Sequence, residues 1–293
     1  MQANFTKIIF GGFGLWISTV LCGKYLKKRG IPIYIFFIKT SQIKEKKGMP
    51  GTKVTGLVIK QSEYGESNRM ISVFTKEYGI IRAAVYGAKS MKSGKGAACR
   101  LLCFSEFEVS RGQSGIYTVY AADALESFYP ISEDIEKLSL AVYLCDITYG
   151  ALGTENRDDA ALSLLMNTLY VLAYKEVPLK KAKCVYELRL MSLAGYRPML
   201  TKCVRCGNIK NIAAFSAHDG GLLCSDCRKN AVAVSKAAVD AMNYIINSDI
   251  KKIFSFSVSD EVLMTLEKIC EEYVRVQLDA EFPSLLYFKK ILI

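Results

Sequence analysis

The stretch KVTGLVIKQSEYGESNRMISVFTKEYGIIRAAVY, residues Lys53 to Tyr86, alternates short apolar segments with turn residues. The apolar segments are Lys53–Gln61, Arg69–Thr75 and Ile80–Tyr86, and all three are rich in the β-branched residues Val, Ile and Thr. Gly, Asn, Ser and charged residues separate them, as expected of turns. The stretch therefore predicts three consecutive β-strands.

Two more β-type segments follow, Leu101–Ser110 and Ile116–Ala122, after a basic, glycine-rich loop at Gly87–Gly96. Five short strands with no helix of any length between them predict a small closed barrel. The five-stranded oligonucleotide-binding (OB) barrel fits this size. An SH3-like barrel remains an alternative, because strand count alone does not separate the two. We assign residues 49–130 to this domain.

From residue 131 onward, apolar residues recur at the helical period, which predicts an α-helical bundle over residues 131–293. Pro130 and Ser132, with Glu133 and Asp134 in the first turn, predict the first helix start. Asp158 is expected to cap the second helix, and further starts are expected near Pro178, Ser235 and Ser259. The apolar stripes of the first two helices are expected to be Ile135, Leu138, Val142, Cys145 and Tyr149, and then Leu162, Leu165, Leu169 and Leu172.

Two CxxC pairs, Cys203 with Cys206 and Cys224 with Cys227, are separated by 17 residues. Paired thiolates at this spacing reach one metal, and two pairs complete a tetrahedron, so residues 203–227 predict a four-cysteine zinc site inserted in the bundle. Four protein ligands leave no open position, which makes the zinc structural. Rubredoxin-like iron and a pair of disulfides are the alternatives. The other six cysteines lie among apolar residues, as reduced thiols do, and indicate a cytoplasmic protein.

The net charge of +11 is unevenly distributed. Residues 1–48 carry nine Lys and Arg against one acidic residue, residues 49–130 carry ten against seven, and the remainder is neutral. The net charge of the barrel region is small, but its basic residues are clustered. A cluster of basic residues can bind a nucleic-acid backbone even where the net charge of the domain is low. The candidate DNA contacts are Lys89, Lys92, Lys95, Arg100, Arg69 and Arg82, although lysines in a Gly/Ser loop are often only solvated. Phe74, Tyr86, Phe104 and Tyr117 are candidates for base stacking, although aromatic residues in a β pattern are more often core.

Residues 1–48 form an atypical extension. Ile8–Cys22 and Ile31–Ile38 are apolar runs followed by basic clusters, but the longer one has 15 residues where a membrane helix needs about 20. A wrongly chosen start codon upstream of Met49 is the favoured explanation. A membrane tether and a structured extension are the other two, and membrane association is not expected.

Nothing in the sequence predicts an enzyme. The one histidine, His218, stands beside a turn in the cysteine-rich segment, and a lone loop histidine excludes His-based triads and zinc–His hydrolase motifs. No GxxxxGK[ST] phosphate loop is present. We therefore expect a binding protein.

Several short motifs, in a fixed order, resemble the RecO family of bacterial recombination mediators over residues 50–290. They are Gly56-Leu-Val-Ile-Lys60, Tyr64-Gly-Glu-Ser-Asn-Arg69, Phe74-Thr-Lys-Glu-Tyr-Gly79, Tyr86-Gly-Ala-Lys89, Tyr186-Glu-Leu-Arg-Leu190, Gly195-Tyr-Arg-Pro198 and the two CxxC pairs. Members of that family differ in whether they keep the zinc cysteines, and this chain has all four. The resemblance implies an α+β protein in which an OB barrel precedes a helical domain.

The resemblance also implies a function in recombinational DNA repair. It implies binding of single- and double-stranded DNA without sequence specificity, annealing of complementary strands, and help in loading RecA on gaps covered by single-stranded DNA-binding protein (SSB). The implied partners are DNA, RecR, SSB, RecF and RecA, at the nucleoid. Lys89, Lys92 and Lys95 match the basic loop to which that family's DNA contact is credited. The competing hypotheses are a zinc-stabilised adaptor whose barrel binds a peptide, and a factor tethered to a membrane through residues 8–38.

Overall fold

The computed structural model describes residues 5–10, 13–18, 51–88, 95–229 and 231–292. The chain divides into two units, Met1–Lys46 and Lys47–Ile293. In the first unit, β1 (Phe5–Phe10) and β2 (Phe13–Ser18) form an antiparallel hairpin, so the described part of the first apolar run is β-structure. Among the described residues, no helix is long and apolar enough to cross a membrane.

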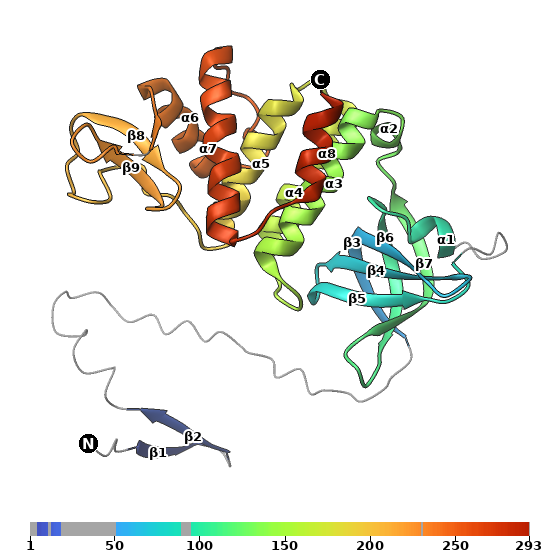
Figure 1. Ribbon diagram of the computed structural model, residues 1–293. Coiled ribbons are helices and arrows are strands. Elements are labelled where there is room, and N and C mark those ends of the chain that lie inside the picture. The colour runs from blue at the N-terminus through green and yellow to red at the C-terminus, as the bar shows by residue number, and fades with distance from the viewer. Residues whose placement is uncertain (1–4, 11–12, 19–50, 89–94, 230, 293) are drawn as a thin grey trace. The chain divides into compact units, whose positions relative to one another are not determined.

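The second unit begins with a closed barrel of five strands (Figure 1). The strands are β3 (Thr52–Tyr64), β4 (Asn68–Thr75), β5 (Gly79–Val85), β6 (Phe104–Arg111) and β7 (Tyr117–Glu126). Their order is β3-β4-β5-β7-β6, with β6 returning to β3 and with β5 and β7 parallel to each other. This is the order of a five-stranded Greek-key OB barrel, so the predicted barrel is confirmed. A single turn of helix, α1 (Lys95–Ala98), precedes β6.

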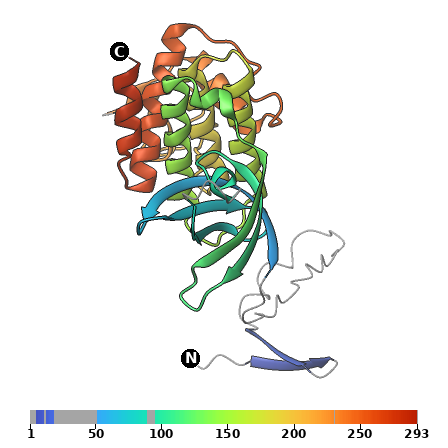
Figure 2. The same cartoon turned by 90° about the vertical axis from the view of Figure 1, so that its right-hand side faces the viewer.

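Seven helices follow in the described part of the chain, and Figure 2 shows them stacked against one end of the barrel. They are α2 (Tyr129–Ser132), α3 (Ile135–Leu152), α4 (Asp159–Tyr174), α5 (Leu179–Leu193), α6 (Lys236–Asn247), α7 (Asp260–Leu278) and α8 (Pro283–Ile291). The α+β architecture, with a barrel followed by helices, is thus confirmed. The expected caps Asp158, Ser235 and Ser259 each accept a hydrogen bond from a backbone N–H in the first turn.

The predicted start of the first long helix was wrong by a few residues. Asp134 is the N-cap of α3 and not part of its first turn, because its carboxylate accepts hydrogen bonds from the N–H groups of Glu136 and Lys137 at 2.9 and 3.1 Å. Pro130 does lie in the first turn of a helix, but that helix is the separate short α2, which ends at Ser132. A capping carboxylate fixes the helix start more firmly than propensity does.

The predicted apolar stripe of α3 was right only in part, whereas that of α4 is confirmed. All four leucines of the α4 stripe are buried. On α3, Cys145 is buried, and Leu138 and Tyr149 are half-buried against the core. Ile135, however, is 55% exposed, and the fully buried residues include Leu140, Tyr143, Leu144 and Ile147. The reason is that α3 packs against helices on several sides and against β3, so its buried surface is far wider than one stripe.

One hydrophobic cluster spans the helices and part of the barrel surface. Leu57, Ile59, Phe74 and Ile80 on the outer side of the barrel are buried in the same hydrophobic cluster as the helical residues. A separate cluster that includes Val58, Ile71, Val73 and Phe107 fills the barrel interior. One part of the outer face of the barrel is therefore unavailable to any ligand.

Gly79, in the turn between β4 and β5, allows the two parts to come this close. Its φ is +69°, and a Cβ built there would lie 2.3 Å from the carbonyl oxygen of Asn156. Beside it, the N–H of Glu155 donates to the carbonyl of Ile80 at 2.9 Å. The turn thus requires glycine both for its conformation and for its contact with the α3–α4 loop.

Candidate metal centre and nucleic-acid interface

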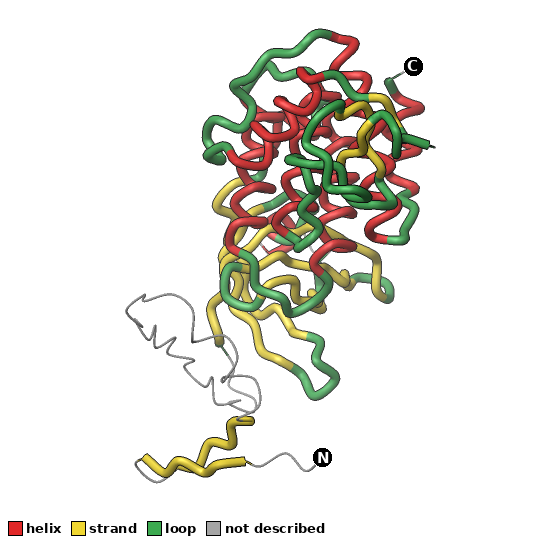
Figure 3. Tube along the Cα trace, turned by 90° about the vertical axis from the view of Figure 1, so that its left-hand side faces the viewer, coloured by secondary structure: helices red, strands yellow, loops and turns green. Residues whose placement is uncertain are grey.

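The cysteine pairs lie in the segment between α5 and α6, which also contains a small sheet; Cys224 ends one of its strands, and the other three cysteines are in loops and turns. The strands of this sheet are β8 (Ile212–Ser216), β9 (Gly221–Cys224) and β10 (Val232–Ala233), in the order β10-β8-β9. Within the second unit, this sheet and the barrel lie on different sides of the helical bundle, with the sheet beside α6 and α7 (Figures 1 and 3). These strands were not predicted, since the segment was characterised only by its cysteine spacing.

The four sulfur atoms of Cys203, Cys206, Cys224 and Cys227 lie within 4.8 Å of one another. The sulfurs of Cys206 and Cys224 are 3.6 Å apart, and all four cysteines are free. Four sulfurs at about 2.3 Å from one tetrahedral metal are separated by roughly 3.8 Å, whereas a disulfide needs about 2.05 Å. The cluster therefore fits a metal and not the disulfide alternative.

The thiols of this cluster differ in pKa. Burial raises the pKa of Cys203, but hydrogen bonds from the backbone at Cys224, Cys206 and Arg205 more than offset it and lower the pKa to about 6. The pKa of Cys227 is raised to about 12, chiefly by its hydrogen bond to Cys224 and by burial. One thiolate forms readily, and further thiolates in the same cluster require a positive ion to stabilise them.

A second group of possible metal ligands, Cys184, Glu187 and Cys270, is fully buried between α5 and α7. Both oxygens of Glu187 are already engaged: Oε1 accepts from the Tyr143 hydroxyl at 2.6 Å, and Oε2 lies 3.2 Å from the Lys183 Nζ. The Lys183 ammonium supplies the positive charge here, so this group is an ion-pair network. The four-cysteine cluster is the candidate metal centre.

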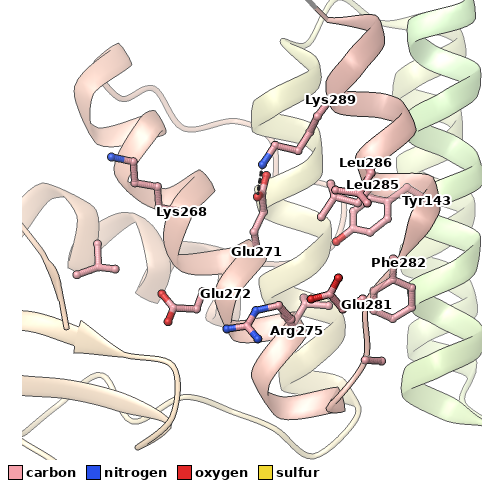
Figure 4. A pocket seen from close by; sticks show the side chains of 13 residues that line it. Tyr143, Lys268, Glu271, Glu272, Arg275, Glu281, Phe282, Leu285, Leu286 and Lys289 are labelled. Carbon is pink, nitrogen blue, oxygen red and sulfur yellow. Dashed lines mark hydrogen bonds and ion pairs between the residues drawn. The ribbon is translucent and has the colours of Figure 1, made fainter. Parts of the chain in front are cut away.

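A cavity of about 460 Å³ borders this network between α3, α7 and α8 (Figure 4). Lys289 of α8 and Glu271 of α7 form an ion pair of 2.8 Å across it. Its rim carries charges of both signs, namely Lys268, Arg275, Glu272 and Glu281. These charges compensate one another, so the cavity has no preference for an anion. The cavity was not predicted because Tyr143 of α3 is far in the chain from the α7 and α8 residues that form most of the lining.

The predicted DNA contacts fall in two places on the barrel. Arg82 is exposed on the outer face of β5. At α1, Lys95 is the first helical residue and is half-buried, Arg100 is exposed, and Arg69 is half-buried and donates to the carbonyl of Gly96 at 3.5 Å. The other two predicted contacts, Lys89 and Lys92, lie outside the described residues.

Of the four stacking candidates, only Tyr86 remains available. Phe74 and Tyr117 are buried, and Phe104 lies under the Lys76 ammonium, 5.5 Å from its ring centroid. Tyr86 is 51% exposed. Tyr120, which was not predicted, is 52% exposed on β7.

Tyr120 lies on the outer side of the barrel. Alternation along β7, where Tyr117 and Val119 point into the barrel core, places it there. The parallel pairing of β5 with β7, in which Ala84 stands opposite Thr118, puts Arg82 and Tyr120 on neighbouring strands. Tyr86 follows in the turn after the end of β5.

Comparison with known proteins gives one consistent result. The family description "Recombination protein O N terminal" matches residues 49–128, and "Recombination protein O C terminal" matches residues 132–286. A DNA repair protein RecO from Acetivibrio thermocellus is 36% identical over 243 residues, covering 82% of this chain and 96% of that protein. One from Alkaliphilus metalliredigens is 32% identical over 244 residues, covering 82% of this chain and 99% of that protein.

Proposed function

The chain belongs to the RecO family of DNA repair and recombination proteins, and from this premise we propose that it is a recombination mediator that binds DNA without sequence specificity. In this proposal the protein is not an enzyme. It binds single- and double-stranded DNA, anneals complementary strands and helps to load RecA on gaps covered by SSB.

The outer surface of the barrel is the observation that carries this proposal. Arg82 and Arg100 are exposed there, and so are the rings of Tyr86 and Tyr120. Cations that track a phosphate backbone and rings that stack on bases are the two elements of sequence-tolerant single-strand binding. Neutralising the phosphates of two strands lowers the repulsion between them, which accelerates annealing.

We assign the helical part and the metal centre to scaffolding and partner binding. In the proposal, residues 49–130 form the DNA-binding domain and residues 131–293 form a helical domain whose four-cysteine cluster holds a structural zinc ion. RecR and SSB, together with RecF and RecA, are the proposed partners, and the nucleoid in the cytoplasm is the proposed location. Four thiolate ligands in a tetrahedral arrangement favour zinc over hard cations such as magnesium and calcium, which prefer oxygen ligands.

The test is annealing of dye-labelled complementary oligonucleotides by the full chain. The variant replaces Lys89, Lys92 and Lys95 by Ala. A matched control replaces Lys236, Lys251 and Lys252 by Ala. These three lysines are exposed on the helical part, and their replacement removes the same amount of charge. The proposal expects the wild type and the control to accelerate annealing and the first variant to lose that activity while remaining folded.

If the wild type neither accelerates annealing nor binds single strands at low salt, the mediator function is wrong. A peptide-binding adaptor, the competing hypothesis, would then account for the barrel.

A further inference from the structure

A small groove lies where the barrel meets α3. It has a volume of about 260 Å³, and its lining includes Lys60 of β3, Ser72 of β4, Arg82 of β5 and Tyr149 of α3. The Lys60 ammonium lies 3.1 Å from the Asp146 Oδ1 and 4.5 Å from the centroid of the Tyr149 ring. The helical part therefore provides one wall of the groove and the barrel provides the other.

The sheet register brings the two cations of the groove into one row. Lys60 pairs with Ser72 across β3 and β4, and Ser72 pairs with Arg82 across β4 and β5. Because adjacent strands are about 4.8 Å apart, the Lys60 and Arg82 backbones are separated by roughly 10 Å. Two long basic side chains starting from these positions can converge on one phosphate, with the Ser72 hydroxyl between them.

The groove offers more donors than acceptors. Among the described residues, the Arg82 side chain makes no hydrogen bond or ion pair, and neither does the Ser72 hydroxyl. Ser62 and the Tyr149 hydroxyl add two more donors to the lining. Within the described part of the chain, Asp146, which Lys60 already engages, is the one carboxylate paired with a cation of this set. Such a donor set suits an anion with several acceptor oxygens.

A purely structural role explains only part of these contacts. The ion pair of Lys60 with Asp146 and the position of its ammonium over the Tyr149 ring hold the barrel against α3. These contacts stabilise the fold whether or not a ligand binds. That role leaves unexplained why Arg82 stands exposed, with no ion pair to any described residue, in the same row. The outer side of the barrel that carries Arg82 also carries the exposed ring of Tyr120 on the neighbouring strand β7, which favours a nucleic-acid strand over an acidic peptide.

We propose that the groove between β3, β4, β5 and α3 holds a phosphodiester of bound single-stranded DNA, with Arg82 and Lys60 as its cationic donors and Tyr149 as its wall. The inference rests on the proposed function and deepens it, because it makes the helical part a component of the DNA-binding surface. Asp146 competes with the phosphate for the Lys60 ammonium. DNA binding therefore moves Lys60 from the carboxylate to the phosphate.

The chain contains a matched pair of carboxylates for the test. Asp146 pairs with Lys60 in the groove, and Glu106 pairs with Lys53 at 2.9 Å farther along β3. Asp146→Asn and Glu106→Gln change the net charge equally, but only the first releases a lysine into the groove. Binding of a fluorescent oligo-dT to the full chain is measured by anisotropy over a range of salt concentrations.

We expect Asp146→Asn to bind the oligonucleotide about two- to fivefold more tightly than Glu106→Gln, as is usual when one partly exposed ion pair is released. Arg82→Gln and Lys60→Gln should each lower the slope of log affinity against log salt by about 0.7, the value for one lost contact with a single strand. Lys53→Gln, outside the groove, should leave that slope unchanged. Far-UV circular dichroism verifies that every variant is folded.

Three results overturn the inference. Equal effects of Asp146→Asn and Glu106→Gln would show that only overall charge matters. Tighter binding of a fluorescent poly-glutamate peptide by Asp146→Asn, without tighter DNA binding, would assign the groove to an acidic peptide. If replacing Lys89, Lys92 and Lys95 abolishes DNA binding while the groove variants bind normally, the groove is refuted and the proposed function stands. A wild type that binds no DNA would instead refute the proposed function itself.

Discussion

Replacing Lys183 by Met should be among the most damaging single changes in the helical part. The Lys183 side chain is fully buried, with its ammonium 3.2 Å from Glu187 and 2.8 Å from Glu271. Without it, Glu271 keeps its ion pair with Lys289, but the equally buried Glu187 keeps only the Tyr143 hydroxyl. Removing one partner of a buried ion pair lowers the free energy of unfolding by about 3–5 kcal/mol, and most of this loss should come from the uncompensated charge of Glu187.

The loss should depend on pH. Burial raises the pKa of Glu187, and the Lys183 ammonium opposes this. In Lys183→Met that opposition is gone, so the folded-state pKa rises further above the unfolded value of about 4.3. A carboxyl whose folded pKa is raised stabilises the fold below its unfolded pKa and loses that contribution as the pH rises. The difference from wild type should therefore be small near pH 4 and should grow toward pH 7.

Urea unfolding followed by far-UV circular dichroism measures both effects. Lys180→Met is the matched control, because Lys180 lies on the same helix but is 51% exposed and pairs with Glu267 at 3.5 Å. It should change the free energy of unfolding by about 0.5 kcal/mol or less. Adding Glu187→Gln to Lys183→Met should recover much of the loss. A cost no larger than that of the control, or one independent of pH, would refute the buried network.

Three further predictions test other parts of the structure. Cys224→Ser should abolish stoichiometric zinc binding, measured by metal analysis, and expose residues 203–227 to proteolysis. DNA affinity should stay normal, because the barrel lies on a different side of the helical bundle. Unchanged zinc content would contradict the four-cysteine site. Gly79→Ala should lower the free energy of unfolding in urea by more than Gly115→Ala does. Both glycines have positive φ, but only at Gly79 would a Cβ meet backbone, 2.3 Å from the Asn156 oxygen. Equal losses of stability would refute the close contact. Asp158→Ala should cost about 1 kcal/mol in the same assay by removing the cap of α4, and no measurable cost would contradict that cap.

The features predicted well from the sequence are those that depend on nearby residues. The barrel strands follow from alternation and turn residues within β3 to β5, and the four-cysteine cluster follows from two short spacings. Caps at Asp158, Ser235 and Ser259 depend on a side chain and the backbone three residues later. In each case the physical interaction spans only a few residues of the chain.

The features that were missed depend on contacts between distant residues. The stripe of α3 was only partly right because neighbours on several sides bury more of this helix than one stripe. Phe74 was a poor stacking candidate because the helices cover that face of the barrel. Nothing local distinguishes Lys60 from other strand lysines; its place beside Tyr149 results from the docking of α3. Strands β8–β10 are short and lie inside a segment whose cysteines dominate its pattern.

The salt dependence of single-strand binding tests the central claim most directly, which is that the barrel surface binds the DNA backbone. The affinity of the full chain for oligo-dT is measured against salt, for the wild type and for a variant with Arg82, Lys95 and Arg100 replaced by Gln. We predict a linear fall of log affinity with log salt, with a slope smaller by about 2 in the variant, since each lost contact with a single strand contributes about 0.7. Equal affinities and equal slopes for the two proteins would contradict the claim.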